Sequence, residues 1–427
     1  MSFSQAVSGL NAAAANLDTI GNNISNSATY GFKGATVSFA DVFAGSGAGL
    51  GVKVAGISQN FKDGSITTTN RPTDVAISGG GFFRIEDQNG GVFYSRNGEF
   101  GKDKNGFLTN MQGMRITGYP VQSVDGKNVV QKGATPTPIV IPTDMMQASA
   151  TDKVGINVNL NSGSEVIDGV KIPDPTDPTK TKLIPPTHKD FLPKSSDADS
   201  YNFSTNVTTY DSLGNEHNIN LFFVKEDGSS NKWRVFAEDS TGKTAMTEVG
   251  KLEYSNDGVL KRGSDFKYEI DFAVNNGAND LKIEFDFTGS TQQKVSESSV
   301  SKLAQNGYQA GEFTNFRIEQ DGSIMATYSN QQSQVVGQIA LANFANPGGL
   351  SSQGDNMWSE TNGSGSPIVG VAGSGVFGKL TNNALEASNV DMSQELVNMI
   401  VAQRNYQSNA QTIKTQDQIL QTLVSLR

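Results

Sequence analysis

The chain has 427 residues, of which 36% are hydrophobic and 18% charged, and its formal net charge is −10. The length predicts two to four domains with cores of their own, and an aromatic content of 8% is too high for a disordered chain. The negative charge argues against nucleic acid and anionic membranes as partners, and the absence of cysteine excludes disulfides, thiolate nucleophiles and cysteine-based zinc sites.

Neither a membrane span nor a secretory signal is expected. No apolar run approaches the roughly 18 residues that a transmembrane helix needs. No basic residue precedes Lys33, and no dense apolar segment follows the first methionine.

The first 25 residues carry a helical pattern. Apolar side chains recur every three or four residues on a narrow stripe, which is typical of a helix that packs against another helix. The stripe contains Phe3, Val7, Leu10, Ala14, Leu17 and, after Gly21, Ile24. Four consecutive alanines from Ala12 to Ala15 favour a helix over residues 2–25.

The following segments read as β-structure. We expect an extended, loosely organised stretch from 30 to 70, which includes the glycine-rich run 45–51. Between 71 and 145, Asn-Gly steps at 89–90, 97–98 and 105–106 separate short apolar runs. Such steps supply the positive φ angles of tight hairpins, so an antiparallel β-domain is predicted.

A second β-domain is predicted from 146 to 306, after a composition shift near Pro136, Pro138 and Pro142. Its strands are expected near 156–160, 207–210, 219–224, 233–237 and 283–287. Six of the thirteen prolines fall between 173 and 193, which predicts a surface excursion because proline cannot donate in a sheet. The pattern of residues 307–365 again resembles that of 71–145, so the two segments are predicted to share one sheet.

A long helix is predicted from Asp391, a suitable N-cap with Gln394 placed as in a capping box. Its stripe contains Met392, Leu396, Met399, Tyr406, Ala410, Ile413, Leu420 and Val424, with Gln403 and Asp417 filling two positions. The polar face beside this stripe is rich in Asn and Gln side chains. A helix of ~55 Å with so narrow a stripe needs a partner. We expect the first helix and neighbouring copies of the chain to supply it.

Together these elements predict a nested, multidomain fold that is mainly β with terminal α-helices. Residues 1–25 and 388–427 would form a helical, coiled-coil-like inner domain. Residues 26–70 and 366–387 would form an extended linker region. Residues 71–145 and 307–365 would form an antiparallel β middle domain, and 146–306 an inserted β outer domain.

The sequence offers no catalytic, cofactor or metal site, so we predict that the chain is not an enzyme. His188 and His217 are its two histidines, and both are expected in solvated loops. The run GSGVFG at 373–378 fits a dinucleotide-binding pattern, but no helix is expected after it, and a flexible joint is the favoured interpretation. Carboxylate pairs for glycoside hydrolysis stay open, because spacing along a chain does not give distances in space.

Both ends resemble one family. LDTIGNNISN at 17–26 and TYGFK at 29–33 stand near the start, and LEASNVD at 385–391 and MIVAQRNYQ at 399–407 near the end. Together they resemble the terminal signatures of bacterial flagellar rod and hook proteins. The matching residues are Asn22, Asn23, Ile24, Asn26, Gly31, Phe32, Lys33, Ser388, Asn389, Val390, Gln403, Arg404 and Tyr406. The large insertion at 146–306 makes hook proteins the better match.

The resemblance implies a self-assembling helical polymer outside the cell, exported by the flagellar type III apparatus without a cleaved signal. It implies a curved, flexible tube that passes torque from rod to filament and has a central export channel. The implied partners are copies of the chain, the distal rod, the hook cap and the hook–filament junction proteins. Phe39 and Phe43 are similar to the Phe-x-x-x-Phe element that early flagellar substrates present to the export gate; a buried aromatic pair is the alternative.

Two other functions stay open at this point. A distal rod or junction protein of the same family would share both terminal signatures. A β-rich extracellular adhesin or glycan-binding protein would use the terminal helices only to dimerise.

Overall fold

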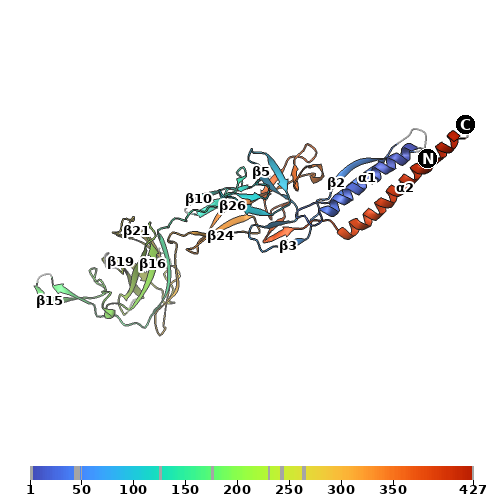
Figure 1. The fold of residues 1–427 in the computed structure, drawn as a ribbon. Coiled ribbons are helices and arrows are strands. Elements are labelled where there is room, and N and C mark those ends of the chain that lie inside the picture. The colour runs from blue at the N-terminus through green and yellow to red at the C-terminus, as the bar shows by residue number, and fades with distance from the viewer. Residues whose placement is uncertain are drawn as a thin grey trace. The chain divides into compact units, whose positions relative to one another are not determined.

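The structure is a computed structural model that describes residues 3–42, 49, 51–124, 127–174, 177–228, 231–240, 245–261 and 266–425. It is mainly β, with helix α1 (Phe3–Ser25) near the start of the chain and helix α2 (Met392–Ser425) at its end (Figure 1). This confirms the predicted combination of β-structure with terminal helices. None of the described helices is both long and apolar enough to cross a membrane.

The chain divides into two compact units. The first comprises Met1–Thr143, Phe313–Thr327 and Ser333–Arg427, and the second Asp144–Glu312 and Tyr328–Gln332. This division keeps the helices with the first β-structure, so the predicted division into four parts stays a prediction.

Local hydrogen bonds mark the start of α2 and the end of α1. The side chain of Asp391 accepts hydrogen bonds from the amides of Ser393 (2.9 Å) and Gln394 (3.2 Å), which confirms it as the N-cap of α2. At the end of α1, the amide of Asn26 donates to the carbonyl of Asn22 (3.1 Å), and the side chain of Asn26 donates to the same carbonyl (3.0 Å). Both bonds go to the carbonyl of Asn22, one of the groups near a helix end that can lack a partner.

The β-part of the first unit draws on both chain segments that were predicted to share a sheet. Its main sheet runs in the order β24-β25-β26-β9-β5-β6-β28-β27, with β7, β8, β12 and β29 attached beside that path. The strands are β1 (Ala35–Asp41), β2 (Val52–Gln59), β3 (Ile66–Thr68), β4 (Val75–Ser78), β5 (Phe82–Glu86), β6 (Val92–Ser95), β7 (Phe100–Lys102), β8 (Leu108–Asn110), β9 (Arg115–Tyr119), β10 (Val121–Val124), β11 (Lys127–Val130), β12 (Thr137–Pro138), β24 (Phe313–Ile318), β25 (Ser323–Tyr328), β26 (Ser333–Asn343), β27 (Ser351–Gly354), β28 (Met357–Ser359), β29 (Ile368–Val371), β30 (Lys379–Asn382) and β31 (Ala384–Glu386), with a short 3₁₀ helix at Pro347–Gly349.

Its core consists of two clusters of buried side chains. Phe83, Ile116 and Leu341 are fully buried in the larger cluster, which mixes aliphatic and aromatic residues. On the other face, Phe82 packs edge-on against Trp358 with ring centroids 5.8 Å apart. Alternation along the strands sends successive side chains to the two faces, so Phe82 and its neighbour Phe83 enter different cores.

The Asn-Gly steps do not all form hairpins. Gly90 and Gly106 have positive φ angles (87° and 85°) and lie in the tight turns β5–β6 and β7–β8, as predicted. The prediction is wrong for Asn97-Gly98, because β7 pairs with β8 and not with β6. A Cβ on Gly98 would lie 1.6 Å from the carbonyl oxygen of Val75, so this glycine permits a close backbone approach.

Two segments expected to be loose contain paired strands. β1 and β2 form an antiparallel hairpin, and β3 pairs with β31. After the 373–378 run comes strand β30, which pairs with β4, and not a helix. The run itself is a turn in which the amide of Gly378 donates to the carbonyl of Gly80 (2.7 Å). The run is therefore hydrogen-bonded to the β-domain, and its role as a flexible joint stays a prediction.

The second unit holds two main sheets, β16-β17-β18-β19 and β20-β21-β13-β22 with β23 paired to β13. All five predicted strands of this region are confirmed. Its elements are β13 (Lys153–Asn161), β14 (Val170–Asp174), β15 (Asp177–Ile184), β16 (Phe203–Tyr210), β17 (Glu216–Lys225), β18 (Lys232–Asp239), β19 (Thr247–Glu253), β20 (Lys267–Phe272), β21 (Leu281–Asp286), β22 (Thr291–Gln293) and β23 (Ser299–Gln305), with a 3₁₀ helix at Ala198–Ser200. Isolated bridges pair Met146 with Gly311 and Ser149 with Tyr308, where the chain enters and leaves the unit.

The proline-rich segment contains a hairpin that the sequence did not predict. β14 and β15 pair antiparallel as a two-stranded ribbon. A ribbon tolerates proline because each of its strands has an edge that needs no donor. The residues that follow are held down by Arg234, whose guanidinium donates to the carbonyls of Pro186 (2.7 Å) and His188 (2.8 Å).

Candidate assembly interface

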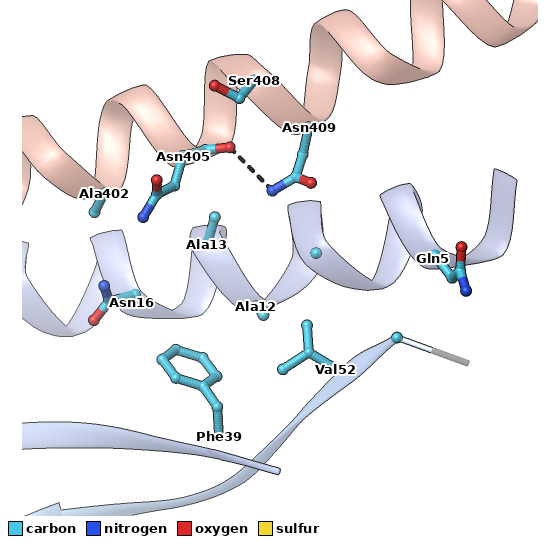
Figure 2. A pocket seen from close by; sticks show the side chains of 12 residues that line it. Gln5, Ala12, Ala13, Asn16, Phe39, Val52, Ala402, Asn405, Ser408 and Asn409 are labelled. Atoms are coloured by element: carbon cyan, nitrogen blue, oxygen red, sulfur yellow. Dashed lines mark hydrogen bonds between the residues drawn. The ribbon is translucent and has the colours of Figure 1, made fainter. Parts of the chain in front are cut away.

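The two terminal helices pack side by side through small and amide side chains. Figure 2 shows Ala13 of α1 pointing toward α2, next to Ala402 and Asn405. Ala402 is only 2% exposed. A Cβ on Gly9 would lie 2.7 Å from Oδ1 of Asn409, so the backbone of α1 approaches α2 closely at this point. The contact between the helices is therefore close but contains few large apolar groups.

A cavity of about 620 Å³ lies along this contact. Phe39 of β1 and Val52 of β2 border it on the side of α1 that carries Ala12 (Figure 2). It is lined by Gln5, Gly9, Ala12, Ala13, Asn16, Phe39, Gly51, Val52, Ala402, Asn405, Ser408 and Asn409. The lining is a mixture of amides and small apolar groups and offers no arrangement of side chains suited to catalysis.

The predicted seam residues lie outside the buried face. The buried residues of α1 are Ala6, Ala12, Ala13, Thr19, Ile20 and Asn23. The predicted seam residues are exposed or half-buried throughout: Phe3, Val7, Leu10, Ala14, Leu17, Ile24, Leu396, Met399, Tyr406, Ala410, Ile413, Leu420 and Val424. Their assignment to contacts between subunits stays a prediction.

Helix α2 carries an apolar surface that sequence reasoning missed in part. We call it the α2 patch; its residues and exposed fractions are Leu396 (46%), Val397 (56%), Ile400 (52%) and Val401 (52%). At about 100° per residue, Leu396 and Ile400 lie on the side of α2 away from Ala402, Asn405 and Asn409, and Val397 lies beside them. Val401 lies nearer to α1 and borders a second cavity together with Ile20 and Val37. In the sequence, Leu396-Val397 and Ile400-Val401 form two apolar pairs four residues apart, and the narrow stripe at intervals of three and four contains only Leu396 of these four residues.

The signature asparagines bind backbone near the helix ends. Asn23 pairs with Ala35 through both amide atoms, accepting from its nitrogen (2.9 Å) and donating to its oxygen (2.8 Å). Asn389 accepts from the amide of Gly34 (2.9 Å) and donates to the carbonyls of Asn60 (2.7 Å) and Lys62 (2.9 Å). Each asparagine thus joins a helix end to a segment beyond it.

The other signature residues have more modest surroundings. Gly31 has a φ of 71°, and a Cβ there would lie 2.5 Å from the nitrogen of Asn97, so only glycine fits. The hydroxyl of Ser388 accepts from the amide of Val390 (3.3 Å). Phe32 is half-buried, while Gln403 and Arg404 are exposed on α2.

Four charged residues meet between the chain ends and the β-domain; we call them the junction cluster (Lys33, Asp63, Arg96 and Glu386). Nζ of Lys33 lies 2.7 Å from Oε1 of Glu386, and both side chains are fully buried. Arg96 contacts Glu386 through Nε (3.4 Å) and Asp63 through Nη2 (2.5 Å). Burial lowers the pKa of Lys33 and Arg96 lowers it further, while Glu386 and Asp63 act in the opposite direction.

The export-gate element is described only in part. Phe39 is 45% exposed beside the cavity, so it is not part of a closed core. Phe43 lies outside the described residues.

The histidines do not form a catalytic site. His188 is in a loop, as predicted. His217 instead lies near the start of strand β17, where its side chain is 17% exposed and its Nε2 lies 3.1 Å from Oδ2 of Asp211. Burial alone would raise the pKa of Asp211, but hydrogen bonds from Asn215, Asn276 and His217 lower it below its usual range. Among the residues that the structure describes, no three His, Asp or Glu side chains gather in a way that could hold a metal ion.

Four family models match successive parts of the chain. They are the flagella basal body rod protein (residues 4–33), the flagellar hook protein FlgE/F/G D1 domain (76–159), the flagellar basal body protein FlaE D2 domain (174–308) and the flagellar basal body rod FlgEFG protein C-terminal (381–426). The two terminal matches cover the signature segments and α2.

Similar proteins match over the full length. The flagellar hook protein FlgE of Salmonella typhimurium is 54% identical over 430 residues, and that of Escherichia coli 52% over 428, with 100% of each chain covered. The crystal structure of Helicobacter pylori flagellar hook protein FlgE2 covers 75% of this chain and 100% of its own with a TM-score of 0.54; at 18% identity it shows a shared fold alone. The chain therefore belongs to the flagellar hook protein family.

Proposed function

We propose that this chain is a structural subunit of the bacterial flagellar hook, where it polymerises with copies of itself. The observation that carries the proposal is the α2 patch. Helix α2 turns its small and amide side chains toward α1 and leaves Leu396, Val397, Ile400 and Val401 half exposed. In an isolated chain the patch stays in contact with water. Neighbouring copies would bury it, and each Å² of buried apolar surface would stabilise the polymer by about 25 cal/mol.

In the polymer, the two helices would form a coiled-coil-like inner layer around a central export channel. The amide-rich flank of α2 suits the wall of a wet pore. The strands of the first unit would form a middle shell. Residues 146–306 would form an outer domain, and its polar surfaces would let neighbouring subunits slide as the tube bends. Heterologous contacts of this kind build an open helix and do not close into a ring.

Membership of the family supports several further roles. We propose contacts with the distal rod, the hook cap and the hook–filament junction proteins, and passage through the flagellar type III export apparatus. The segment around Phe39 and Phe43 is proposed as the export-gate element. A structural role of this kind needs no catalytic residue, cofactor or metal.

Electron microscopy of the polymerised protein tests the proposal. Curved tubes are expected; straight tubes would instead indicate a rod or junction protein of the same family. Chains lacking 1–25 or 391–427 should remain folded in their β-domains and form no tubes. Tube growth by either truncated chain would contradict the proposal, and glycan binding by the β-domains without any polymer would favour an adhesin.

A further inference from the structure

The chain contains six Asn-Gly steps, which are chemically labile. In such a step the backbone nitrogen of the glycine can attack Cγ of the asparagine, because glycine has no Cβ to obstruct the approach. The side-chain nitrogen leaves as ammonia, which takes up the proton of the attacking N–H, and a succinimide ring remains. Water opens this ring at either carbonyl and gives aspartate or isoaspartate. The steps begin at Asn89, Asn97, Asn105, Asn276, Asn306 and Asn362.

The attack needs a mobile side-chain amide, and three of the steps do not have one. Oδ1 of Asn97 accepts a hydrogen bond from the backbone amide two residues further on (3.1 Å). Nδ2 of Asn276 donates to Oδ2 of Asp211 (2.6 Å). Oδ1 of Asn306 accepts from the amide of Asp152 (3.2 Å). Each of these side chains has to break a hydrogen bond before its Cγ can turn toward the glycine nitrogen.

The attack also needs a glycine whose backbone can turn, and in two further steps the glycine is fixed. Gly106 is buried, its carbonyl accepts from the amide of Ile141 (2.8 Å), and a Cβ on it would lie 2.7 Å from the carbonyl oxygen of the same isoleucine. The amide of Gly363 donates to Oγ1 of Thr361 (3.0 Å), and its carbonyl accepts from Nδ2 of Asn346 (2.9 Å). The nitrogen of either glycine can move only if these bonds break.

The remaining step, Asn89-Gly90, is held at neither position. Both residues are exposed in the β5–β6 turn, and within the described part of the chain the side-chain amide of Asn89 has no hydrogen-bond partner. Nothing lies within 4 Å of a Cβ built on Gly90. The amide of Gly90 donates to the carbonyl of Asp87 over a long distance (3.3 Å). Asn105 stands in the same Asp-x-Asn-Gly pattern, so the difference between the two turns comes from the fold.

We propose that Asn89 is a site of spontaneous deamidation, and that the folded chain directs this reaction to Asn89 ahead of the other five steps. The product carries a new negative charge two residues from Asp87, whose Oδ1 accepts from the amides of Asn89 and Gly91 (2.8 and 2.7 Å). Isoaspartate also lengthens the backbone inside this turn by one carbon atom. The reaction consumes water, releases ammonia and needs no partner protein or cofactor.

Ageing of the full, unpolymerised chain at mildly alkaline pH tests the proposal. Peptide mapping by mass spectrometry follows the change from amide to acid at each step, and labelling with an isoaspartyl methyltransferase identifies isoaspartate. Asn89 should react about tenfold faster than each of the other five, because a hydrogen bond that has to break first raises the barrier by an amount of this order. In a chain unfolded by urea, the lead of Asn89 should disappear.

Thr361→Val gives a matched test of the restraint on the glycine. It removes the hydroxyl that binds the amide of Gly363, so deamidation of Asn362 should become faster while the rate at Asn89 stays unchanged. An unchanged rate at Asn362 would show that this bond does not restrain the step and would overturn the assignment.

Two further outcomes would overturn the proposal. One is an equal rate at Asn89 and Asn105 in the folded chain. The other is an equal lead of Asn89 in folded and urea-unfolded chains, because the neighbouring residues and not the fold would then set the rate. All rates are measured without polymer formation, so the proposed function is tested separately.

Discussion

Nζ of Lys33 and Oε1 of Glu386 are 2.7 Å apart although 353 residues separate them in the chain. Both side chains are fully buried. Next to Lys33 in the chain, the backbone of Gly34 and Ala35 is hydrogen-bonded to the side chains of Asn389 and Asn23. The segments that follow α1 and precede α2 are thereby joined to the β-domain. Forces on the helices can therefore pass into the β-domain through bonded contacts, as the proposed transfer of torque requires.

The α2 patch gives the first prediction. Ile400→Ser should leave the unfolding of the isolated chain unchanged within about 0.5 kcal/mol, because the side chain is already half exposed. In the polymer it would lose about 1.5–3 kcal/mol of apolar burial, so the critical concentration should rise about tenfold to a hundredfold. Sedimentation of the polymer measures this. Gln407→Ser, exposed on the same helix, controls for helix propensity; an equal effect there would contradict a role for the patch.

Two glycines of α1 give a matched pair. Nothing lies within 4 Å of a Cβ built on Gly21, so Gly21→Ala should stabilise the helix by about 0.5–1 kcal/mol and slow its amide exchange a few-fold. Gly9→Ala would place a methyl group 2.7 Å from Oδ1 of Asn409. The Asn409 amide would have to turn away and lose its bond to the carbonyl of Asn405 (3.0 Å), which offsets the gain. Equal slowing in both variants would show that α2 does not pack on Gly9.

Alkaline pH should weaken the first unit through Tyr94. Burial and the nearby carboxylate of Glu360 raise the pKa of Tyr94 to about 12, against a smaller opposing effect of Arg84. The folded state therefore holds this proton more tightly than the unfolded chain, whose tyrosine has a pKa near 10. The resulting stability is fully present below pH 10 and is lost as the pH rises toward 12, with a slope of at most about 1.4 kcal/mol per unit.

Urea unfolding measured from pH 9 to 12 checks this slope. Tyr94→Phe keeps the ring, which lies 4.7 Å from that of Phe344, and loses only the hydroxyl. Its free energy of unfolding should fall less steeply with pH than that of the wild type. Parallel curves would rule out Tyr94 as the source.

Arg234 should hold the loop after the β14–β15 hairpin in place. Its side chain is 3% exposed; the guanidinium donates to both carboxylate oxygens of Glu248 (2.9 and 2.5 Å) and lies 4.9 Å from the ring centroid of Phe236. Arg234→Met should destabilise the second unit by about 2–3 kcal/mol, because it leaves two carbonyls and a carboxylate without donors. Arg234→Lys should recover only part of this, since an ammonium group cannot bind four acceptors in the same plane.

Trp233 reports this unfolding if the other tryptophan, Trp358, is replaced by Phe. Lys251→Met is the control: Lys251 forms an exposed ion pair with Glu226 (2.8 Å), and its loss should change stability by less than about 1 kcal/mol. A similar loss of stability in both variants would mean that the buried position of Arg234 has no special effect.

The sequence predicted the elements better than their contacts. Apolar intervals of three and four gave both helices, and Asp391 gave the start of α2, because these are local effects. The face that each helix buries was not predictable, since α2 has one stripe near Ala402 and another at Val397 and Ile400. Asn97-Gly98 failed as a hairpin signal because close approach to Val75 needs a glycine as much as a turn does.

The junction cluster was beyond sequence reasoning. Lys33 appeared as part of a family signature, but nothing local connects it with Glu386 or Arg96. An ion pair between residues so far apart depends on the complete fold. His217 was misplaced for a similar reason: its partner Asp211 is near in sequence, but only the β16–β17 hairpin brings the two side chains together.

The paired bridges at Met146–Gly311 and Ser149–Tyr308 have a consequence for exchange between relatives. The long segment of the second unit, Asp144–Glu312, begins and ends at adjoining points, although Tyr328–Gln332 also belongs to that unit. We therefore expect this long segment to be exchangeable between relatives. A replacement segment of another length, joined at these two bridges, would leave the pair of Lys33 and Glu386 undisturbed. A chimera whose new terminus lacked the matching charge would break their pairing, so Lys33 and Glu386 have to be exchanged as a pair.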